Sequence, residues 1–336
     1  MFFWRQYFMR SDICDKIKTW FLGKKCPGDK AEELIGYCIA SYDENAPFLK
    51  SGFLLNVDKI SPIEKYLLDM VLPLADKMFV REDIKFFVWV AHVLHYLKPE
   101  YEYLCSYVNF CEIDREYAGV LCLYGVISGL DDLEKNYNEK KIPDRYLSAS
   151  LEEVGVWIED AWKNNIIGLE NDSWVIFTMK FKLFRIGRLQ YEPSIFNYEY
   201  VSWQGERTLT EENMPILSIH IPEKGRLTCI PESLSEAKVF FESFFPEKKF
   251  KAFVCCTWIL DPNLSLLLDE NSNIIKFNRL FNILPGECKS TALMNVFGDE
   301  NIDLKTIEPK TTLHKNMIEY LLAGNRLSDR FGYILI

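Results

Sequence analysis

The sequence predicts a two-domain protein of mixed class, in which an all-α N-terminal domain precedes a domain built on a mixed β-sheet flanked by helices. The chain has 336 residues, enough for two ordinary domains. In its first part apolar residues recur at helical spacing, whereas after Ser150 strand-like runs alternate with helical ones. The polar, proline-containing stretch Asn136–Arg145 lies just before this change and is expected to be the linker region. We therefore expect a helical domain over residues 1–147 and an α/β domain over residues 148–336.

The charge and hydropathy of the chain exclude several classes of protein. A net charge of −10 and a pI near 5.1 argue against non-specific binding to nucleic acid, which requires neutralisation of phosphates. The longest apolar run, Phe86–Leu97, is interrupted by two histidines and is shorter than the roughly 20 residues that span a bilayer. The start, "MFFWRQYFMR", lacks the apolar core and the cleavage site of a signal peptide. We expect no membrane segment and a cytoplasmic location.

Ten cysteines are scattered along the chain without a C-x-x-C pair. This pattern predicts free thiols in a reducing compartment and no structural zinc site. His92 and His95 share a helix face, but no carboxylate is placed beside them by the pattern, so no metal site is expected there either.

The expected helices of the first domain follow from apolar periodicity and from start and stop signals. Ser61-Pro62-Ile63-Glu64 is typical of a helix start, with a capping box and proline in the first turn. Pro73 is expected to kink that helix, and Pro99 to end a later one. The predicted helices are Asp29–Ala40, 61–79, Asp83–Leu97, 101–112 and 114–130.

The second domain is expected to open with a helix and then to alternate strands with helices. Ser150-Leu151-Glu152-Glu153 is a second capping box, which predicts a helix to about Lys163. The strand-like runs are "SWVIFTMK", "FKLFRIGRLQYE", "ILSIHI", "KAFVCCTWIL" and Tyr333–Ile336. The expected helices between them are Ser233–Phe245, Ser272–Asn282 and Thr312–Ala323.

The stretch Leu217–Phe245 is a strand, a basic loop and a helix, an arrangement that can hold an anion. A period of two places Ser218 and His220 on one face of the strand, and Pro222 should end its pairing. The turn Lys224-Gly225-Arg226 follows, and Ser233 opens a third capping box. A helix start with added positive charge suits a phosphate. The alternative is an ordinary strand-to-helix connection with solvated basic side chains.

Several segments in this half of the chain resemble a known family. They are "LEEVGVWI", "LFRIGRLQYE", "LSIHIPEKGRL", "FFESFFPE", "FKAFVCCTWILDPNL", "ENSNIIKF" and "TTLHKNMIEYLLAGN". In this order they resemble bacterial two-domain proteins classed as acyltransferases. Those proteins join a helical N-acyltransferase N-terminal domain to a GNAT-like C-terminal domain. The helical half of this chain is similar to its counterpart in general character only.

The resemblance implies acyl-coenzyme A as co-substrate, no metal, and a small-molecule amine as acceptor. In the GNAT fold two neighbouring strands part, the pantetheine lies in the gap, and the pyrophosphate sits on the loop and helix after the first strand. Carried over, the strands are Ile216–Ile221 and Lys251–Leu260. The coenzyme-binding residues implied are Ile221, Lys224, Gly225, Arg226, Ser233 and Asn273.

The chain departs from the GNAT pattern at two places. Only Gly225 remains of the usual R/Q-x-x-G-x-G/A phosphate loop, and Leu280 and Phe281 occupy the position of a common tyrosine acid. These departures leave open a second hypothesis, a degenerate GNAT scaffold that binds a ligand or partner without turnover.

Three residues are candidates for deprotonating or binding the acceptor. His220 is the expected general base, because an amine must lose a proton to act as a nucleophile and imidazole titrates near neutral pH. The alternative is a hydrogen-bonded core histidine. Arg188 and Gln190, read as neighbours on one face of a strand, could hold an acceptor carboxylate, with a structural salt bridge as the alternative for Arg188. The favoured function is acyl transfer from coenzyme A to an amine.

Overall fold

The computed structural model describes residues 13, 15–24, 26, 28–171, 173–196, 213–222, 224–284, 286 and 288–336. The chain divides into two compact units, the first ending at Leu183 and the second beginning at Phe184. The expected division at residues 147/148 lies earlier, inside a helix that runs from Asp144 to Lys163 without a break.

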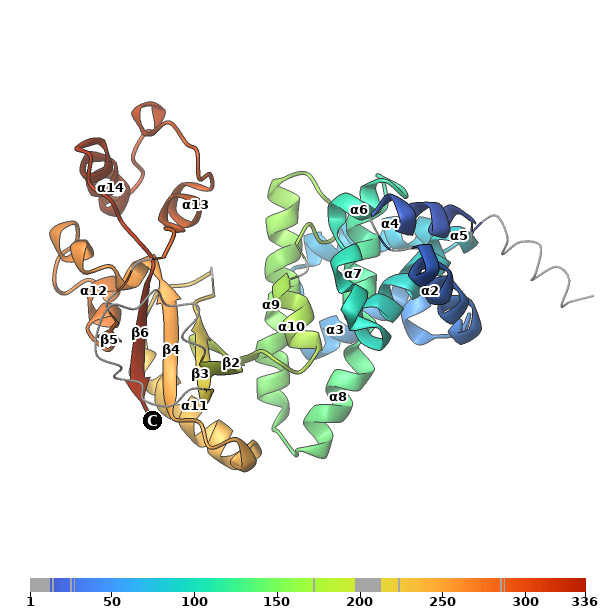
Figure 1. The fold of residues 1–336 in the computed structure, drawn as a ribbon, viewed down its shortest axis with the longest axis horizontal. Helices are drawn as coiled ribbons and strands as arrows, with labels where there is room; N and C mark the ends of the chain where they lie inside the picture. Colours follow the sequence, from blue (N-terminus) through green and yellow to red (C-terminus); the bar gives the residue numbers. More distant parts are fainter. Residues whose placement is uncertain are drawn as a thin grey trace, which may run out of the picture. The chain divides into compact units, whose positions relative to one another are not determined.

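The first unit is helical throughout its described part (Figure 1). Residues 15–23 are α-helical. The helices that follow are α2 (Gly28–Ser41), α3 (Leu54–Ile60), α4 (Lys65–Met78), α5 (Glu82–His92), α6 (Tyr107–Cys111), α7 (Ala118–Ile127), α8 (Leu130–Glu139), α9 (Asp144–Lys163) and α10 (Ser173–Met179). Short 3₁₀ turns η1 (Pro47–Leu49), η2 (Ser51–Phe53) and η4 (Pro99–Leu104) connect some of them, and a π-helical turn, η3 (Val93–Leu97), continues α5.

Helix α7 lies at the centre of this unit. Its sequence, AGVLCLYGVI, has no charged residue, and all of its side chains are buried. A helix that is apolar on every side is stable only when other helices surround it. Gly119 permits the closest approach, because a Cβ there would lie 2.3 Å from the carbonyl oxygen of Ile167.

Four expectations for this region were wrong. Ser61 does not cap a helix, since α4 begins at Lys65 and follows Glu64. The stretch 136–145 is not a linker, since α8 continues to Glu139 and α9 begins at Asp144. "SWVIFTMK" is α10 rather than a strand, because an apolar run this short fits either element and packing against α9 and α7 decides it. Ser150 does not cap a helix, since it is buried inside α9, where its hydroxyl lies 3.3 Å from the hydroxyl of Tyr137.

The two histidines of α5 and η3 are held inside the helical unit. The ring of His92 stacks on Phe48, and its Nδ1 lies 2.9 Å from the hydroxyl of Ser128. Burial is the main cause that lowers the pKa of His92 to about 4. His95 is buried, with Nδ1 3.0 Å from a carboxylate oxygen of Glu102.

This depressed pKa predicts acid sensitivity of the helical unit. The unfolded chain binds a proton at His92 near the ordinary pKa of 6.5, whereas the folded unit resists protonation down to about 4. The neutral His92 therefore supports the full free energy of unfolding above pH 6.5. As the pH falls from 6.5 toward 4, the unfolded chain takes up a proton that the folded unit does not, and the free energy of unfolding decreases. Denaturant unfolding across this range should show a flatter pH dependence in His92→Gln than in the wild type. The control His314→Gln should follow the wild type, and parallel curves for His92→Gln would contradict the prediction.

The second unit is a six-stranded mixed sheet with flanking helices (Figure 1). Its strands are β1 (Phe184–Ile186), β2 (Leu189–Phe196), β3 (Met214–His220), β4 (Ala252–Thr257), β5 (Asn282–Ile283) and β6 (Arg330–Leu335), in the order β1-β2-β3-β4-β6-β5. Only β3 and β4 are parallel; all other neighbours are antiparallel. The helices are α11 (Ile230–Phe244), α12 (Asn273–Asn278), α13 (Ala292–Phe297) and α14 (Thr312–Leu322), with 3₁₀ turns η6 (Pro246–Lys248), η7 (Trp258–Leu260), η8 (Pro262–Leu266) and η9 (Leu304–Thr306).

Helix α11 covers one face of the sheet through aromatic contacts. Phe240 and Phe241 are buried against Phe184 of β1, with ring centroids 5.5 and 5.7 Å away. Val239, the residue before this pair, is 60% exposed and belongs to the outer side of the helix. On the opposite face of the sheet is an apolar cluster of Phe196, Met214, Ile216, Ala252, Val254 and Leu284.

A second apolar cluster joins the turns after β4 to the C-terminal helices. It consists of Trp258, Leu264, Leu267, Ile275, Ala292, Met317 and Leu327. No helix in the described part of the chain is both long and apolar enough to cross a membrane.

Candidate functional site

The sheet opens between β3 and β4. These strands pair in parallel at three positions only, the last of which joins Ser218 to Val254. Both strands continue past this pair, β3 to His220 and β4 to Thr257. Along that length β3 stays paired with β2, and β4 with β6. The two strands therefore part beyond Ser218 and Val254 and leave a gap edged by backbone.

His220 lies at the edge of this gap with a carboxylate partner. Its Nε2 is 3.0 Å from Oε2 of Glu192, and the side chains are 24% and 27% exposed. The antiparallel register places His220 opposite Gln190, and Ser218 opposite Glu192, so all four residues share one face. A carboxylate that hydrogen-bonds a histidine fixes the orientation of the ring. Glu192 was not predicted as a partner, because the pairing depends on a strand register that the sequence pattern does not give.

Arg188 does not lie on the strand where the sequence placed it. The stretch 184–196 is a hairpin, β1 and β2, whose two-residue loop is Gly187 and Arg188. Gly187 has a positive φ of 61°, a conformation that glycine adopts without steric cost in such loops.

The Arg188 guanidinium instead holds the basic turn that follows β3. Its Nε donates to the carbonyl oxygen of Arg226 at 2.8 Å. Its Nη2 donates to the carbonyl oxygens of Pro222 and Gly225, both at 2.9 Å. These contacts fix the turn while the side chains of Lys224 and Arg226 remain exposed. Arg188 thus has a structural use, and the geometry argues against its predicted contact with an acceptor. Gln190, its predicted companion, is buried with 4% of its surface exposed.

The helix after the turn begins earlier than the capping box predicts. Helix α11 starts at Ile230, since Cys229 turns the chain with a left-handed φ of 55° and Pro231 suits the first helical turn. No side chain caps this start. First-turn N–H groups without a side-chain cap, together with the helix dipole, favour an anion.

Ser233 does not cap this helix, and its burial argues against the predicted contact with phosphate. Its side chain is 2% exposed and faces the β1–β2 hairpin. Its hydroxyl donates to the carbonyl oxygen of Ile186 at 2.5 Å and accepts from the N–H of Leu189 at 3.3 Å. The Tyr191 hydroxyl lies 2.9 Å from the same oxygen. Ser233 therefore anchors the helix to the hairpin, because tertiary partners replace the local cap.

Asn273 and two cysteines of β4 also bear on the site. Asn273 is exposed at the first position of α12, and none of the described contacts joins it to the gap. Cys255 is buried, and Cys256, on the other face of β4, is exposed, as alternation along the strand predicts. Desolvation raises the pKa of both thiols, that of Cys256 to about 12 with help from Cys288 and Asp329. Both thiols are protonated at neutral pH, which makes them poor nucleophiles.

Within the described ranges, no group of three or more histidine, cysteine, aspartate or glutamate side chains is placed to hold a metal ion.

Comparison with known proteins gives a family match for one domain and a structural match for the fold. A family profile described as a GNAT-like C-terminal domain matches residues 183–334. No curated protein matches the chain in sequence. Among solved structures, the chain is similar to an acyltransferase in complex with decanoyl-CoA and teicoplanin, with a TM-score of 0.73 and 19% identity, covering 94% of this chain and 98% of that one.

Two further structures agree with the first. An acyltransferase in complex with CoA and 10C-teicoplanin gives a TM-score of 0.74 at 18% identity, again covering 94% of this chain and 98% of that one. A mutant acyltransferase in complex with octanoyl-CoA gives 0.63 at 20%, covering 85% and 94%. A helical unit followed by a mixed-sheet unit is thus the fold of these acyltransferases, and the expected fold class is confirmed.

Proposed function

Because residues 183–334 form a GNAT-like C-terminal domain, we propose that this protein transfers an acyl group from an acyl-coenzyme A to an amine. The observation that carries the proposal is the opening between β3 and β4, where the ladder ends at Ser218 and Val254 although both strands continue. Strand edges that face a gap can hydrogen-bond the two amides of a pantetheine arm as a further strand would. In this proposal Ile221 and the end of β3 form one side of the gap in which the pantetheine arm lies.

The phosphates of the coenzyme have a matching place just beyond the gap. The turn after β3 exposes Lys224 and Arg226, and the uncapped start of α11 follows it directly. Positive side chains and first-turn N–H groups together favour a pyrophosphate. The Arg188 contacts support this use, since a turn held at three carbonyl oxygens needs little reordering on binding.

His220 is the proposed general base. The amine nitrogen attacks the thioester carbon, the carbon–sulfur bond breaks, and the coenzyme leaves as its thiolate. His220 accepts the proton that the nitrogen gives up, and Glu192, at 3.0 Å, stabilises the resulting imidazolium. This pair, His220 and Glu192, lies at the end of β3, beside the expected position of the thioester.

The same comparison suggests which substrates to propose. One similar acyltransferase binds decanoyl-CoA and teicoplanin, and another binds octanoyl-CoA. We therefore propose an acyl-CoA with an alkyl chain as donor and an amine on a small molecule as acceptor. Octanoyl-CoA and decanoyl-CoA are the first donors to test.

A non-catalytic GNAT scaffold remains the second candidate because of two specific observations. Gly225 is the one glycine of the phosphate turn, and the position of the usual tyrosine acid carries Leu280 and the buried Phe281. A scaffold of this kind would bind coenzyme or acceptor without turnover. Binding and turnover measured on the same preparation separate the two candidates.

Removing the charges of the turn tests the coenzyme site. The double change Lys224→Ala, Arg226→Ala should weaken binding of coenzyme A at least 10-fold, since each charged hydrogen bond contributes about 1–3 kcal/mol. The melting temperature should stay unchanged, because both side chains are exposed. Calorimetric titration gives the affinity, and Lys276→Ala, Lys315→Ala in the same unit is the matched control. Equal losses in both double variants would place the phosphates elsewhere.

A further inference from the structure

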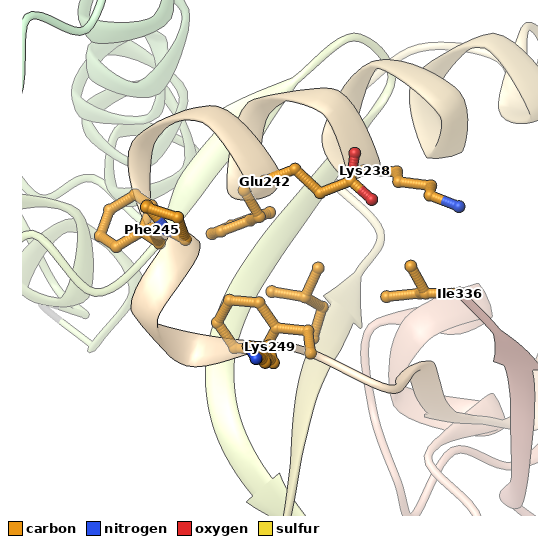
Figure 2. Close-up of a pocket in the computed structure, with 9 residues that line it drawn as sticks. Lys238, Glu242, Phe245, Lys249 and Ile336 are labelled. Atoms are coloured by element: carbon orange, nitrogen blue, oxygen red, sulfur yellow. The ribbon is translucent and has the colours of Figure 1, made fainter.

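A cavity of about 290 Å³ lies between the second half of α11 and the sheet, away from the start of that helix (Figure 2). Lys238 follows Ile230 by eight positions, which places it about 12 Å along the helix from the proposed phosphate site. The lining residues are Leu217, Lys238, Phe241, Glu242, Phe245, Pro246, Lys249, Phe250 and Ile336.

The inner wall of the cavity is apolar and largely aromatic. Leu217, Phe241 and Phe245 are at most 5% exposed. The ring of Phe241 lies 5.5 Å from that of Phe245 and 5.3 Å from that of Phe250. A cavity of about 150 Å³ is enough to hold a benzene molecule, so this one has room for an aryl or branched alkyl group with a polar end attached.

The mouth of the cavity carries three charged side chains. Figure 2 shows Lys238 and Glu242 on the α11 side and Lys249 across the cavity from Glu242. In the part of the chain that the structure describes, no ion pair involves any of the three, although Lys238 and Glu242 stand four positions apart on one helix. Two lysines and one glutamate therefore stand beside the apolar residues in the lining of the cavity.

We propose that this cavity binds an amino acid with an apolar side chain, which is a function separate from acyl transfer. The side chain would lie on the phenylalanine rings, the α-carboxylate would meet Lys249 and Lys238, and the α-ammonium would meet Glu242. A simple carboxylate would leave Glu242 facing a like charge, and a simple amine would face two lysines. A zwitterion matches both signs of charge in the lining.

Ligands that lack one charge test this match. Calorimetric titration of the full chain should show binding of L-phenylalanine. 3-Phenylpropanoate, which lacks the ammonium group, and 2-phenylethylamine, which lacks the carboxylate, should each bind at least 10-fold more weakly. L-Leucine serves as a second zwitterion with an alkyl side chain.

Matched variants assign each charge to its partner. Glu242→Gln should weaken phenylalanine about 10-fold and leave 3-phenylpropanoate unchanged or tighter. Lys249→Gln should weaken phenylalanine and 3-phenylpropanoate and spare 2-phenylethylamine. Glu319→Gln and Lys276→Gln, at exposed positions of the same unit, should change nothing.

Two results would overturn the proposal. One is the absence of binding by the folded wild-type chain for both phenylalanine and leucine. The other is an equal loss of affinity for all three phenyl ligands in either variant. This pattern would mean that Glu242 and Lys249 do not distinguish the charged groups of the ligand. Coenzyme A affinity, measured in parallel, should be the same in every variant, so failure here leaves the acyl-transfer proposal standing.

Discussion

Replacing His220 by glutamine is expected to lower the rate of acyl transfer roughly 10²- to 10⁴-fold, the range over which a positioned base acts. Glutamine keeps much of the size and a hydrogen-bonding group but cannot accept the proton of the amine. Coenzyme binding and the fold should survive, since His220 lies at the end of β3, partly exposed, with its backbone paired to Gln190. The measurement is single-turnover transfer from octanoyl-CoA.

Glu192, the hydrogen-bond partner of His220, supplies the control for this result. Glu192→Gln keeps a hydrogen bond to the ring but removes the charge that stabilises the imidazolium, so it should lower the rate by less than His220→Gln. The double variant should be no slower than His220→Gln alone, because both residues act on one proton transfer. A His220→Gln protein with wild-type rates would remove the base assignment. One that unfolds would identify His220 as a core histidine.

Replacing Ser233 by alanine is expected to destabilise the sheet unit by about 2–4 kcal/mol. The substitution leaves the carbonyl oxygen of Ile186, the N–H of Leu189 and the hydroxyl of Tyr191 without the shared partner they have in the interior. Each buried polar group left unpaired costs about 1–3 kcal/mol, and partial relaxation reduces the sum.

Denaturant unfolding of Ser233→Ala beside Ser235→Ala checks this expectation. Ser235 is exposed on the same helix, so its replacement should change the free energy of unfolding little. If Ser233 were a phosphate ligand instead, its removal would weaken coenzyme A and leave stability intact. That outcome would contradict the buried geometry.

The sequence predicted β3 and the turn after it well because their signals are local. A period of two, a proline that stops pairing and a glycine between two basic residues each act within a few positions. The same rules place Cys255 and Cys256 on opposite faces of β4, which the structure confirms.

The wrong predictions concern side chains whose positions depend on residues distant in the sequence. A capping box predicted Ser233 as a helix cap, yet the hydroxyl is taken by the hairpin. Reading residues 181–192 as one strand hid the loop at Gly187 and so gave Arg188 the wrong face. Glu192 was missed as the partner of His220 because their pairing depends on register between two strands. Sequence periodicity reports which residues alternate, whereas tertiary hydrogen bonds decide which of them meet.

A crystal structure of the protein with bound octanoyl-CoA tests the central claim most directly. The account predicts a pantetheine arm between β3 and β4 beyond the pair of Ser218 and Val254, with the pyrophosphate at the Lys224–Arg226 turn and the thioester carbon beside His220. Octanoyl-CoA bound elsewhere, with β3 and β4 closed against each other, would contradict it.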